Sequence, residues 1–324
     1  MNSSQAKTPV ALFVYNRPAH TRTVLESLSR CRRVDECAVR IYCDGAKCPE
    51  HSAGVAETRE VAREWATRLN AEVIERETNL GLARSVVSGV SELCDQFGRA
   101  IVIEDDFVLS PSFLDYMISA LDRYAGEANV YQISGFMYPI RHAPKPDAFF
   151  LPLTTTWGWA TWARAWRIFD WNPADAEELL RDPEVRRRFD LNGAYPYAEM
   201  LERKLRGEID SWGILFWWAV FRANGLVLHP RKSLVWNGGF DKSGTHCGDQ
   251  AWSTQSLAEI ADDSWAASSF KFPEQVATDE LAFGKVIRFL RREQSQGNLV
   301  ERIRRRVLQT LRRRETEQVH ANNG

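Results

Sequence analysis

Short apolar runs alternate with segments of helical spacing through the first hundred residues, and this alternation constrains the fold more than any other feature. Residues 10–15, 39–43, 72–75 and 101–103 have the composition of buried strands. Residues 19–32, 57–69 and 82–97 between them carry apolar side chains at three- and four-residue spacing. This order predicts an α/β fold with a mostly parallel central sheet that helices cover on both faces.

Ligands of such sheets bind beyond the carboxyl ends of the strands. The residues that follow the four predicted strands are therefore the first candidates for a binding site. They are Asn16-Arg17, Asp44-Gly45, Asn79-Leu80-Gly81 and Glu104-Asp105-Asp106.

The composition narrows the class of protein. Of 324 residues, 44% are hydrophobic and 11% aromatic, which is enough for a sizeable core and excludes a disordered, collagen-like or coiled-coil chain. No apolar run approaches the roughly 20 residues of a membrane span, and residues 1–7 lack the pattern of a signal peptide. Six cysteines are too few for a disulfide scaffold in a chain of this length. We therefore expect a cytoplasmic protein with reduced thiols.

A basic tail follows a mildly acidic body. Residues 284–324 hold 11 basic and four acidic side chains, whereas the rest of the chain has a net charge of −8. Within the tail, Val300, Ile303, Val307 and Leu311 form an apolar stripe at helical spacing. We predict a single α/β catalytic domain at 8–283. A basic amphipathic helix at 284–324 is predicted to contact an anionic membrane surface. A helix that docks on protein stays open as an alternative, and no nucleic-acid module is recognisable, so nucleic acid is not an expected partner.

Glu104, Asp105 and Asp106 form the sharpest local motif, since three consecutive carboxylates end an apolar strand. They repel one another unless a cation or water screens them, and Mg²⁺ and Mn²⁺ commonly take one or two carboxylates together with phosphate oxygens. In an extended chain, Glu104 and Asp106 point to one side and Asp105 to the other. The motif therefore predicts a site for Mn²⁺ or Mg²⁺ with one direct ligand, and a solvated acidic turn is the alternative.

The acidic triplet and the following residues 107–116 resemble the acidic motif of metal-dependent nucleotide-sugar glycosyltransferases of the GT-A fold. The N-acetylglucosaminyltransferase I type is the most similar, and bacterial family 2-like glycosyltransferases share the pattern. Over roughly residues 8–250 the likeness continues, in order, through Tyr15-Asn16-Arg17-Pro18, Asp44-Gly45, Asn79-Leu80-Gly81-Leu82-Ala83, Trp157-Gly158-Trp159, Asp210-Ser211-Trp212 and Gly244-Thr245-His246. The resemblance implies a GT-A domain that transfers a hexosyl or N-acetylhexosaminyl group from a nucleoside diphosphate sugar, most simply a UDP-sugar. With the basic tail, it implies a glycan or lipid-linked acceptor in bacterial surface polysaccharide synthesis.

The resemblance also implies roles for matched positions, with Asp106 as the metal ligand. The implied donor-binding residues are Tyr15, Asn16, Arg17, Asp44, Asn79, Arg84, Glu104, Asp105, Trp157, Trp159 and His246. Several have structural alternatives. Asp44 is also a typical turn residue before glycine, Arg17 could pair with a surface acid, and Asn79 is a plausible helix cap. His246 follows a glycine-rich segment, 236–246, that reads as a mobile loop, and it could equally be an exposed loop histidine.

Tryptophan gathers in the second half of the chain, where ten of twelve lie between Trp157 and Trp252. Trp162 and Trp166 have the spacing of a buried helix face. Trp157 and Trp159 flank Gly158, and we expect these two indoles to face a sugar ring.

Asp210 is the predicted catalytic base, because it precedes an apolar run at 212–218 and would be partly desolvated there. It would deprotonate the acceptor hydroxyl for one in-line attack, with inversion at the anomeric carbon. Glu208 is the rival acid, and a helix cap is the structural alternative for Asp210. For the whole chain, a sugar nucleotidyltransferase and a non-catalytic glycan-binding protein stay open. The first usually carries a glycine-rich loop where this chain has Tyr15-Asn16-Arg17-Pro18.

Overall fold

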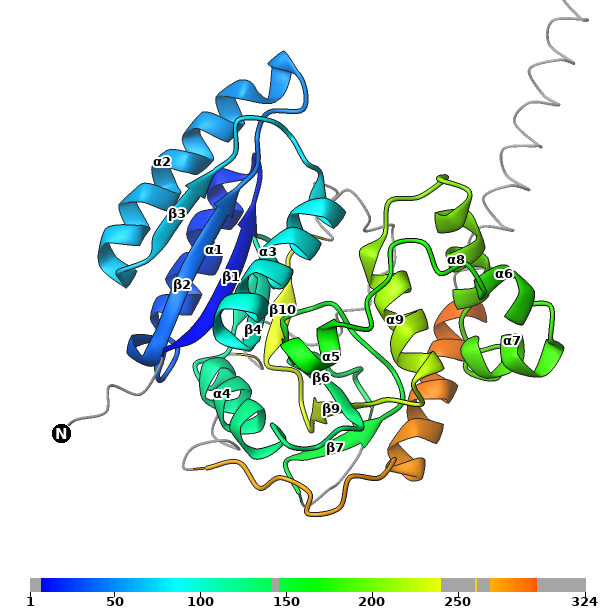
Figure 1. The fold of residues 1–324 in the computed structure, drawn as a ribbon. Helices are drawn as coiled ribbons and strands as arrows, with labels where there is room; N and C mark the ends of the chain where they lie inside the picture. The colour runs from blue at the N-terminus through cyan, green and yellow to red at the C-terminus, as the bar shows by residue number, and fades with distance from the viewer. Residues whose placement is uncertain (1–6, 141–145, 240–259, 261–268, 296–324) are drawn as a thin grey trace, which may run out of the picture.

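The computed structural model describes residues 7–140, 146–239, 260 and 269–295, and an eight-stranded sheet forms its centre (Figure 1). The strand order is β3-β2-β1-β4-β8-β6-β9-β7. The strands are β1 Thr8–Val14, β2 Cys37–Cys43, β3 Glu72–Glu75, β4 Arg99–Glu104, β6 Val130–Ser134, β7 Ala148–Leu151, β8 Trp159–Trp162 and β9 Leu226–Pro230. β8 and β7 run antiparallel to their neighbours and the other strands share one direction. The predicted α/β class with a mostly parallel sheet is confirmed.

The helices cover both faces of this sheet and extend beyond it. They are α1 Pro18–Ser29, α2 Ser52–Leu69, α3 Leu82–Phe97, α4 Phe113–Arg123, α5 Ala163–Trp166, α6 Ala176–Leu179, α7 Pro183–Phe189, α8 Tyr197–Leu205 and α9 Trp212–Arg222, with short 3-10 turns η1 Val34–Glu36 and η2 Pro49–His51. The first three helices and first four strands lie where the apolar periodicity predicts them. A further helix spans residues 280–295.

Two local predictions are wrong. Trp162 and Trp166 do not share a helix face, because Trp162 ends β8 and Trp166 ends the short α5. Trp236 and Asn237 do not belong to a loop. They form β10 (Val235–Asn237), which pairs antiparallel with β5 (Phe107–Leu109) in a small second sheet. Hydrogen bonding to a distant strand overrides the local turn signal of the glycines that follow.

Alternate residues of the strands supply the two sides of the core. Leu12 of β1 and Ile41 of β2 face the buried side chains of α1, α2 and α4. Phe13 and Tyr42, one position later, stack on each other at 5.1 Å on the face that α3 covers. Because successive strand side chains point to opposite faces, a sheet that is covered on both needs continuous apolar runs, as this sequence has.

A second, helical core adjoins the sheet beyond β7 (Figure 1). Trp217 and Trp218 of α9 pack there with Phe189 of α7. Val286 and Leu290 of the helix at 280–295 are fully buried in the same core. The predicted boundary between 283 and 284 therefore falls inside a packed helix, and residues 296–324, with the predicted apolar stripe, lie outside the described residues. No helix in the described part of the chain is both long enough and apolar enough to cross a bilayer.

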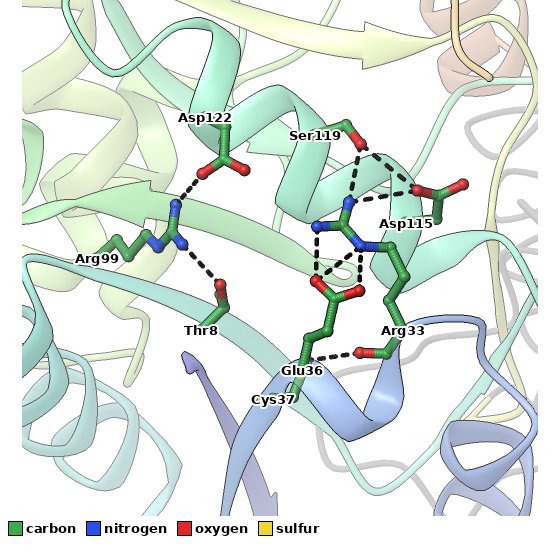
Figure 2. A network of polar contacts seen from close by, with 8 residues as sticks. All are labelled: Thr8, Arg33, Glu36, Cys37, Arg99, Asp115, Ser119 and Asp122. Carbon is green, nitrogen blue, oxygen red and sulfur yellow. Dashed lines mark hydrogen bonds and ion pairs between the residues drawn. The ribbon is translucent and has the colours of Figure 1, made fainter. Parts of the chain in front are cut away.

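Charged side chains join the amino-terminal end of the sheet to α4 (Figure 2). Arg33, which precedes η1, binds Glu36 at 2.8 Å and reaches Asp115 and Ser119 of α4 at 3.4 and 3.1 Å. Arg99 at the start of β4 binds Asp122 of α4 and, at 2.7 Å, the Thr8 hydroxyl of β1. These arginines are neutralised by protein carboxylates, so this end of the sheet is built as a structural anchor.

His229 of β9 gives the fold a predictable response to acid. Its ring is fully buried, with Nε2 2.9 Å from the carbonyl oxygen of Leu153 and Nδ1 3.3 Å from that of Phe136. Burial lowers the pKa of His229 to about 4, and the two carbonyls only partly oppose this effect. Between pH 6.5 and 4 the unfolded chain therefore binds a proton that the folded chain does not, and stability falls as the pH falls.

We expect His229→Gln to remove part of this dependence, because glutamine does not titrate and can still donate to a carbonyl. Between pH 6.5 and 4, the wild type should lose up to about 3 kcal/mol more free energy of unfolding than the variant loses. Urea unfolding at several pH values measures both slopes. Equal slopes would show that the acid sensitivity comes from other groups.

Candidate functional site

The residues that follow β1 and β4 meet, because these two strands are neighbours in the sheet. The guanidinium of Arg17 forms an ion pair with Asp105 and lies 3.2 Å from Oδ2 of Asp106. Burial lowers the pKa of Arg17, but the charges and hydrogen bonds of the two aspartates outweigh burial and raise it. Arg17 therefore stays charged, and it pairs with the acidic motif instead of a surface acid.

The acidic motif carries more negative charge than Arg17 can neutralise. Burial, followed by the charges of Asp106 and Asp105, raises the pKa of Glu104 well above its usual range. Burial also raises the pKa of Asp105, and the Arg17 charge opposes this rise. Arg17 thus pairs with two of the three consecutive carboxylates, and a bound cation would reverse these shifts by stabilising the ionised forms.

Asp106 is the carboxylate best suited to bind that cation. Its Oδ1 is buried and has no hydrogen-bond partner in the described structure, whereas its Oδ2 lies beside Arg17. No three His, Cys, Asp or Glu side chains converge as a complete metal site in residues 7–140, 146–239, 260 and 269–295. The arrangement fits Mn²⁺ or Mg²⁺ with one or two protein carboxylates and oxygens from a phosphate ligand and water.

Gly238 and Gly239, which follow β10, approach Asp106 closely. The Gly238 amide donates to the Asp106 carbonyl at 2.7 Å, and a Cβ at Gly239 would lie 2.6 Å from Asp106 Oδ2. The buried Asn237 accepts a 2.7 Å hydrogen bond from the Gly239 amide. Sequence reasoning missed Asn237 and Gly239 as site residues. Their signal was present as Asn-Gly-Gly directly after an apolar pair, which marks a close backbone approach.

Asp44, after β2, binds the turn that leads into α3. Its Oδ1 accepts from the Leu80 amide at 2.9 Å, and its Oδ2 accepts from the Gly81 amide at 2.9 Å and from Asn79 Nδ2 at 3.1 Å. The carboxylate is 6% exposed. Both Asp44 and Asn79 therefore have a structural task here, which is to hold the turn at the carboxyl end of the sheet. Ser85 and Arg84 follow in the first turn of α3, and Arg84 is exposed.

Tyr15 and Asn16 line the connection from β2 to α2. The Tyr15 hydroxyl accepts from the Lys47 amide at 2.9 Å and contacts His51 Nδ1 at 2.7 Å. The Asn16 carbonyl lies against Gly54, where a Cβ would be only 2.9 Å away. These contacts fix the rim of the sheet beside β1, where a nucleoside is expected.

The two predicted sugar-facing tryptophans have different surroundings. Trp157 is half-buried, with its ring 4.5 Å from that of Phe136. Trp159 is fully buried and stacks on Trp212 at 5.1 Å, so its ring is part of the core. His246 lies outside the described residues.

Asp210 lies beside Gly81 at the amino end of α3, although the two residues are far apart in sequence. A Cβ at Gly81 would lie 3.8 Å from Asp210 Oδ2, and Lys204 of α8 binds Asp210 Oδ1 at 3.0 Å. The alternative that Asp210 caps α9 is wrong, because Ser211 is the N-cap and accepts from the Ile214 amide. The expected desolvation is also wrong, since the Asp210 side chain is 59% exposed. Glu208, the rival, pairs with Arg206 at 2.5 Å.

We expect Gly45→Ala to disturb the turn that Asp44 holds. A Cβ at Gly45 would lie 2.5 Å from the carbonyl carbon of Thr78, and backbone cannot move aside as a flexible side chain can. The variant should lose about 1–3 kcal/mol in the free energy of unfolding. Gly126→Ala is the matched control, because nothing lies within 4 Å of its added Cβ. Urea unfolding of both variants is the measurement, and equal stabilities would contradict the close approach.

Neither family models nor curated sequences assign this chain to a family. No family model matches the chain, and no curated protein matches it. Solved structures do match. Residues 1–349 of Staphylococcus aureus TarS align at 14% identity and a TM-score of 0.43, covering 73% of this chain and 62% of that one.

Two further solved structures carry a nucleotide and a metal. GalNAc-T7 with UDP, GalNAc and Mn²⁺ aligns at 8% identity and a TM-score of 0.47, covering 73% of this chain and 44% of that one. The Pyrobaculum calidifontis mannosyltransferase PcManGT with GDP-Man and Mn²⁺ aligns at 14% identity and a TM-score of 0.41, covering 89% and 84%. This chain spans less than two thirds of the TarS and GalNAc-T7 chains. At these identities and TM-scores the matches assign no function to this chain.

Proposed function

We propose that this chain is a divalent-metal-dependent glycosyltransferase that moves a sugar from a nucleoside diphosphate sugar to an acceptor hydroxyl, with inversion. One observation carries the proposal. In the part of the chain that the structure describes, a buried oxygen of Asp106 without a hydrogen-bond partner lies on the carboxylate that pairs with Arg17, and the carboxylate of Asp210 lies beside Gly81 at the amino end of α3. A diphosphate leaving group needs the first two, and an attacking hydroxyl needs the third.

The residues proposed to bind the donor lie at the carboxyl ends of β1, β2 and β4. Asp106 would hold Mn²⁺ or Mg²⁺, with Glu104 and Asp105 supporting it or binding sugar and ribose hydroxyls. Tyr15 and Asn16 would contact the base and ribose, most simply of a uridine nucleotide. Asp44 and Asn79 would act by holding the turn before α3, so that the amino end of the helix and Arg84 face the diphosphate.

Fewer aromatic side chains are proposed to contact the sugar than the sequence predicts. Trp157 remains the proposed aromatic contact for the transferred hexose or N-acetylhexosamine, because its ring is partly accessible. Trp159 is left out because its ring is fully buried, and it supports the site from the core. His246 keeps its proposed role at the metal or the diphosphate.

The reaction is a single displacement. The acceptor hydroxyl gives its proton to Asp210, and its oxygen forms a bond to the anomeric carbon. The bond from that carbon to the diphosphate oxygen breaks, and the electron pair leaves with the nucleoside diphosphate. When bound, the divalent cation supplies Lewis-acid neutralisation of the leaving diphosphate. Arg17 keeps Asp105 and Asp106 oriented, and the exposed Asp210 carboxylate lies where an acceptor can approach from solvent.

The acceptor that the sequence favours is a glycan or a lipid-linked precursor of a bacterial surface polysaccharide. The basic composition of residues 296–324, which follow the packed helix at 280–295, supports this part of the proposal, because basic segments are attracted to anionic membrane surfaces. The proposed setting is accordingly the cytoplasmic face of a membrane, with the tail as a peripheral contact.

The products distinguish this function from its two rivals. The protein is incubated with UDP-, GDP- and dTDP-sugars and Mn²⁺, with EDTA as the metal-free control. A glycosyltransferase slowly releases nucleoside diphosphate from one donor in the metal-containing sample. Release of pyrophosphate would identify a nucleotidyltransferase, and binding without any release would identify a glycan- or nucleotide-binding protein.

We expect Asp106→Asn to abolish metal-dependent donor binding, because the amide removes the charge and half of the ligand capacity of the buried oxygen pair. Isothermal titration with the reactive donor and Mn²⁺ should show at least about a 10-fold loss of affinity. Asp95→Asn, on the exposed side of α3, is the matched control and should bind as the wild type does. Full metal-dependent binding by the Asp106 variant would refute the assigned ligand.

We expect Asp210→Asn to bind donor normally and to lose transfer, because an amide cannot accept the hydroxyl proton. The loss in kcat should be about 100-fold or more. Glu208→Gln tests the rival acid in the same assay. If the Glu208 variant is inactive and the Asp210 variant is active, the base is Glu208.

A further inference from the structure

Lys204 of α8 is the direct partner of the proposed base. Its Nζ lies 3.0 Å from Asp210 Oδ1. This is the only ion pair of Asp210 within the part of the chain that the structure describes. Asp210 Oδ2 makes no hydrogen bond there, and it is the oxygen that lies beside Gly81 at the amino end of α3. The two carboxylate oxygens therefore have different surroundings.

The two side chains of this pair differ in how firmly they are held. Lys204 is only 16% exposed, whereas Asp210 is 59% exposed. The Lys204 ammonium lies 5.7 Å from the ring centroid of Trp171, within the range of a cation–π contact. Trp171 in turn packs edge-on against Phe169, and Phe169 stacks on Trp166 in the core. A row of aromatic rings thus runs from the core to the lysine, and its outermost ring, Trp171, is itself 36% exposed.

An exposed aspartate on a loop would otherwise sample several rotamers. A base must lie within hydrogen-bonding reach of the proton that it removes, and an error of about 1 Å in position can cost about 100-fold in rate. Lys204 is therefore the more restrained partner, and Asp210 is the side chain whose orientation the pair would restrict. Surface ion pairs contribute little to stability, so the value of this pair lies in orientation.

We infer that Lys204 is a positioning residue for Asp210. Its ammonium holds Oδ1, so that Oδ2 faces the amino end of α3 and receives the acceptor proton. This inference rests on the proposed function, because it assigns a role relative to the base. Trp171 restrains the lysine and does not contact the base itself.

A double-mutant cycle tests the inference with the full-length protein, the donor that reacts in the nucleotide-release assay and Mn²⁺. The variants are Lys204→Met, Asp210→Asn and their combination, with Lys204→Arg as the charge-retaining variant. Lys271→Met is the control, since its side chain is exposed and lies outside the site. Methionine keeps most of the volume of the buried lysine stem, and thermal melts verify folding. Lys204→Gln replaces it in the cycle if the methionine variant does not fold.

We expect Lys204→Met to lower kcat by about 10- to 100-fold with little change in the KM for donor. Lys204→Arg should recover most of the rate. In the Asp210→Asn background, the lysine substitution should cost less than about 2-fold, because it acts through the carboxylate that is already gone. Lys271→Met should match the wild type.

Three results would overturn the inference in distinguishable ways. Wild-type rates for Lys204→Met beside an inactive Asp210→Asn would remove the positioning role and leave the function intact. An equal loss in both backgrounds would show that Lys204 acts structurally or on another group. Absence of nucleoside diphosphate release by the wild type with every donor would remove the proposed function, and this inference with it.

Discussion

The pairing of Arg17 with Asp105 and Asp106 is the interaction on which the candidate site depends. It joins the ends of two neighbouring strands and holds the buried Asp105 and the partly buried Asp106 beside one guanidinium. Burial, together with the charge of the neighbouring Asp106, raises the pKa of Glu104 and of Asp105, and the Arg17 charge only partly opposes this rise. The structure therefore maintains a local demand for positive charge, which a divalent cation with a diphosphate ligand would meet.

Charged side chains are paired differently at the two ends of the sheet. At the amino ends, Arg33 and Arg99 are each neutralised by carboxylates of neighbouring elements, and these pairs connect the strands to α4 (Figure 2). At the carboxyl ends, the carboxylates of the acidic motif outnumber the one arginine that pairs with them. Gly239 approaches one of them, Asp106, closely. Parallel strands put all their carboxyl ends on one edge, so an anchor and a reactive edge can be separated by the length of a strand.

Apolar periodicity was sufficient to predict the first half of the fold, because strands buried on both faces and amphipathic helices have different repeats. Two contacts between strand ends follow from the predicted strand order: Arg17 pairs with the acidic motif, and Asn79 donates to Asp44. The prediction failed where a distant partner decided the outcome. Trp236 and Asn237 became a strand because β5 was there to pair with them.

Local sequence alone determined that this protein is an α/β protein with carboxylates after its fourth strand, because hydrophobic repeats and charge runs need no knowledge of distant contacts. Only the tertiary structure decided which side chains remain accessible and which acids have partners. Trp159 is buried where Trp212 packs on it, and Asp210 lies beside Gly81 and pairs with Lys204 of α8. Such packing joins segments that lie far apart along the chain, and no local pattern specifies it.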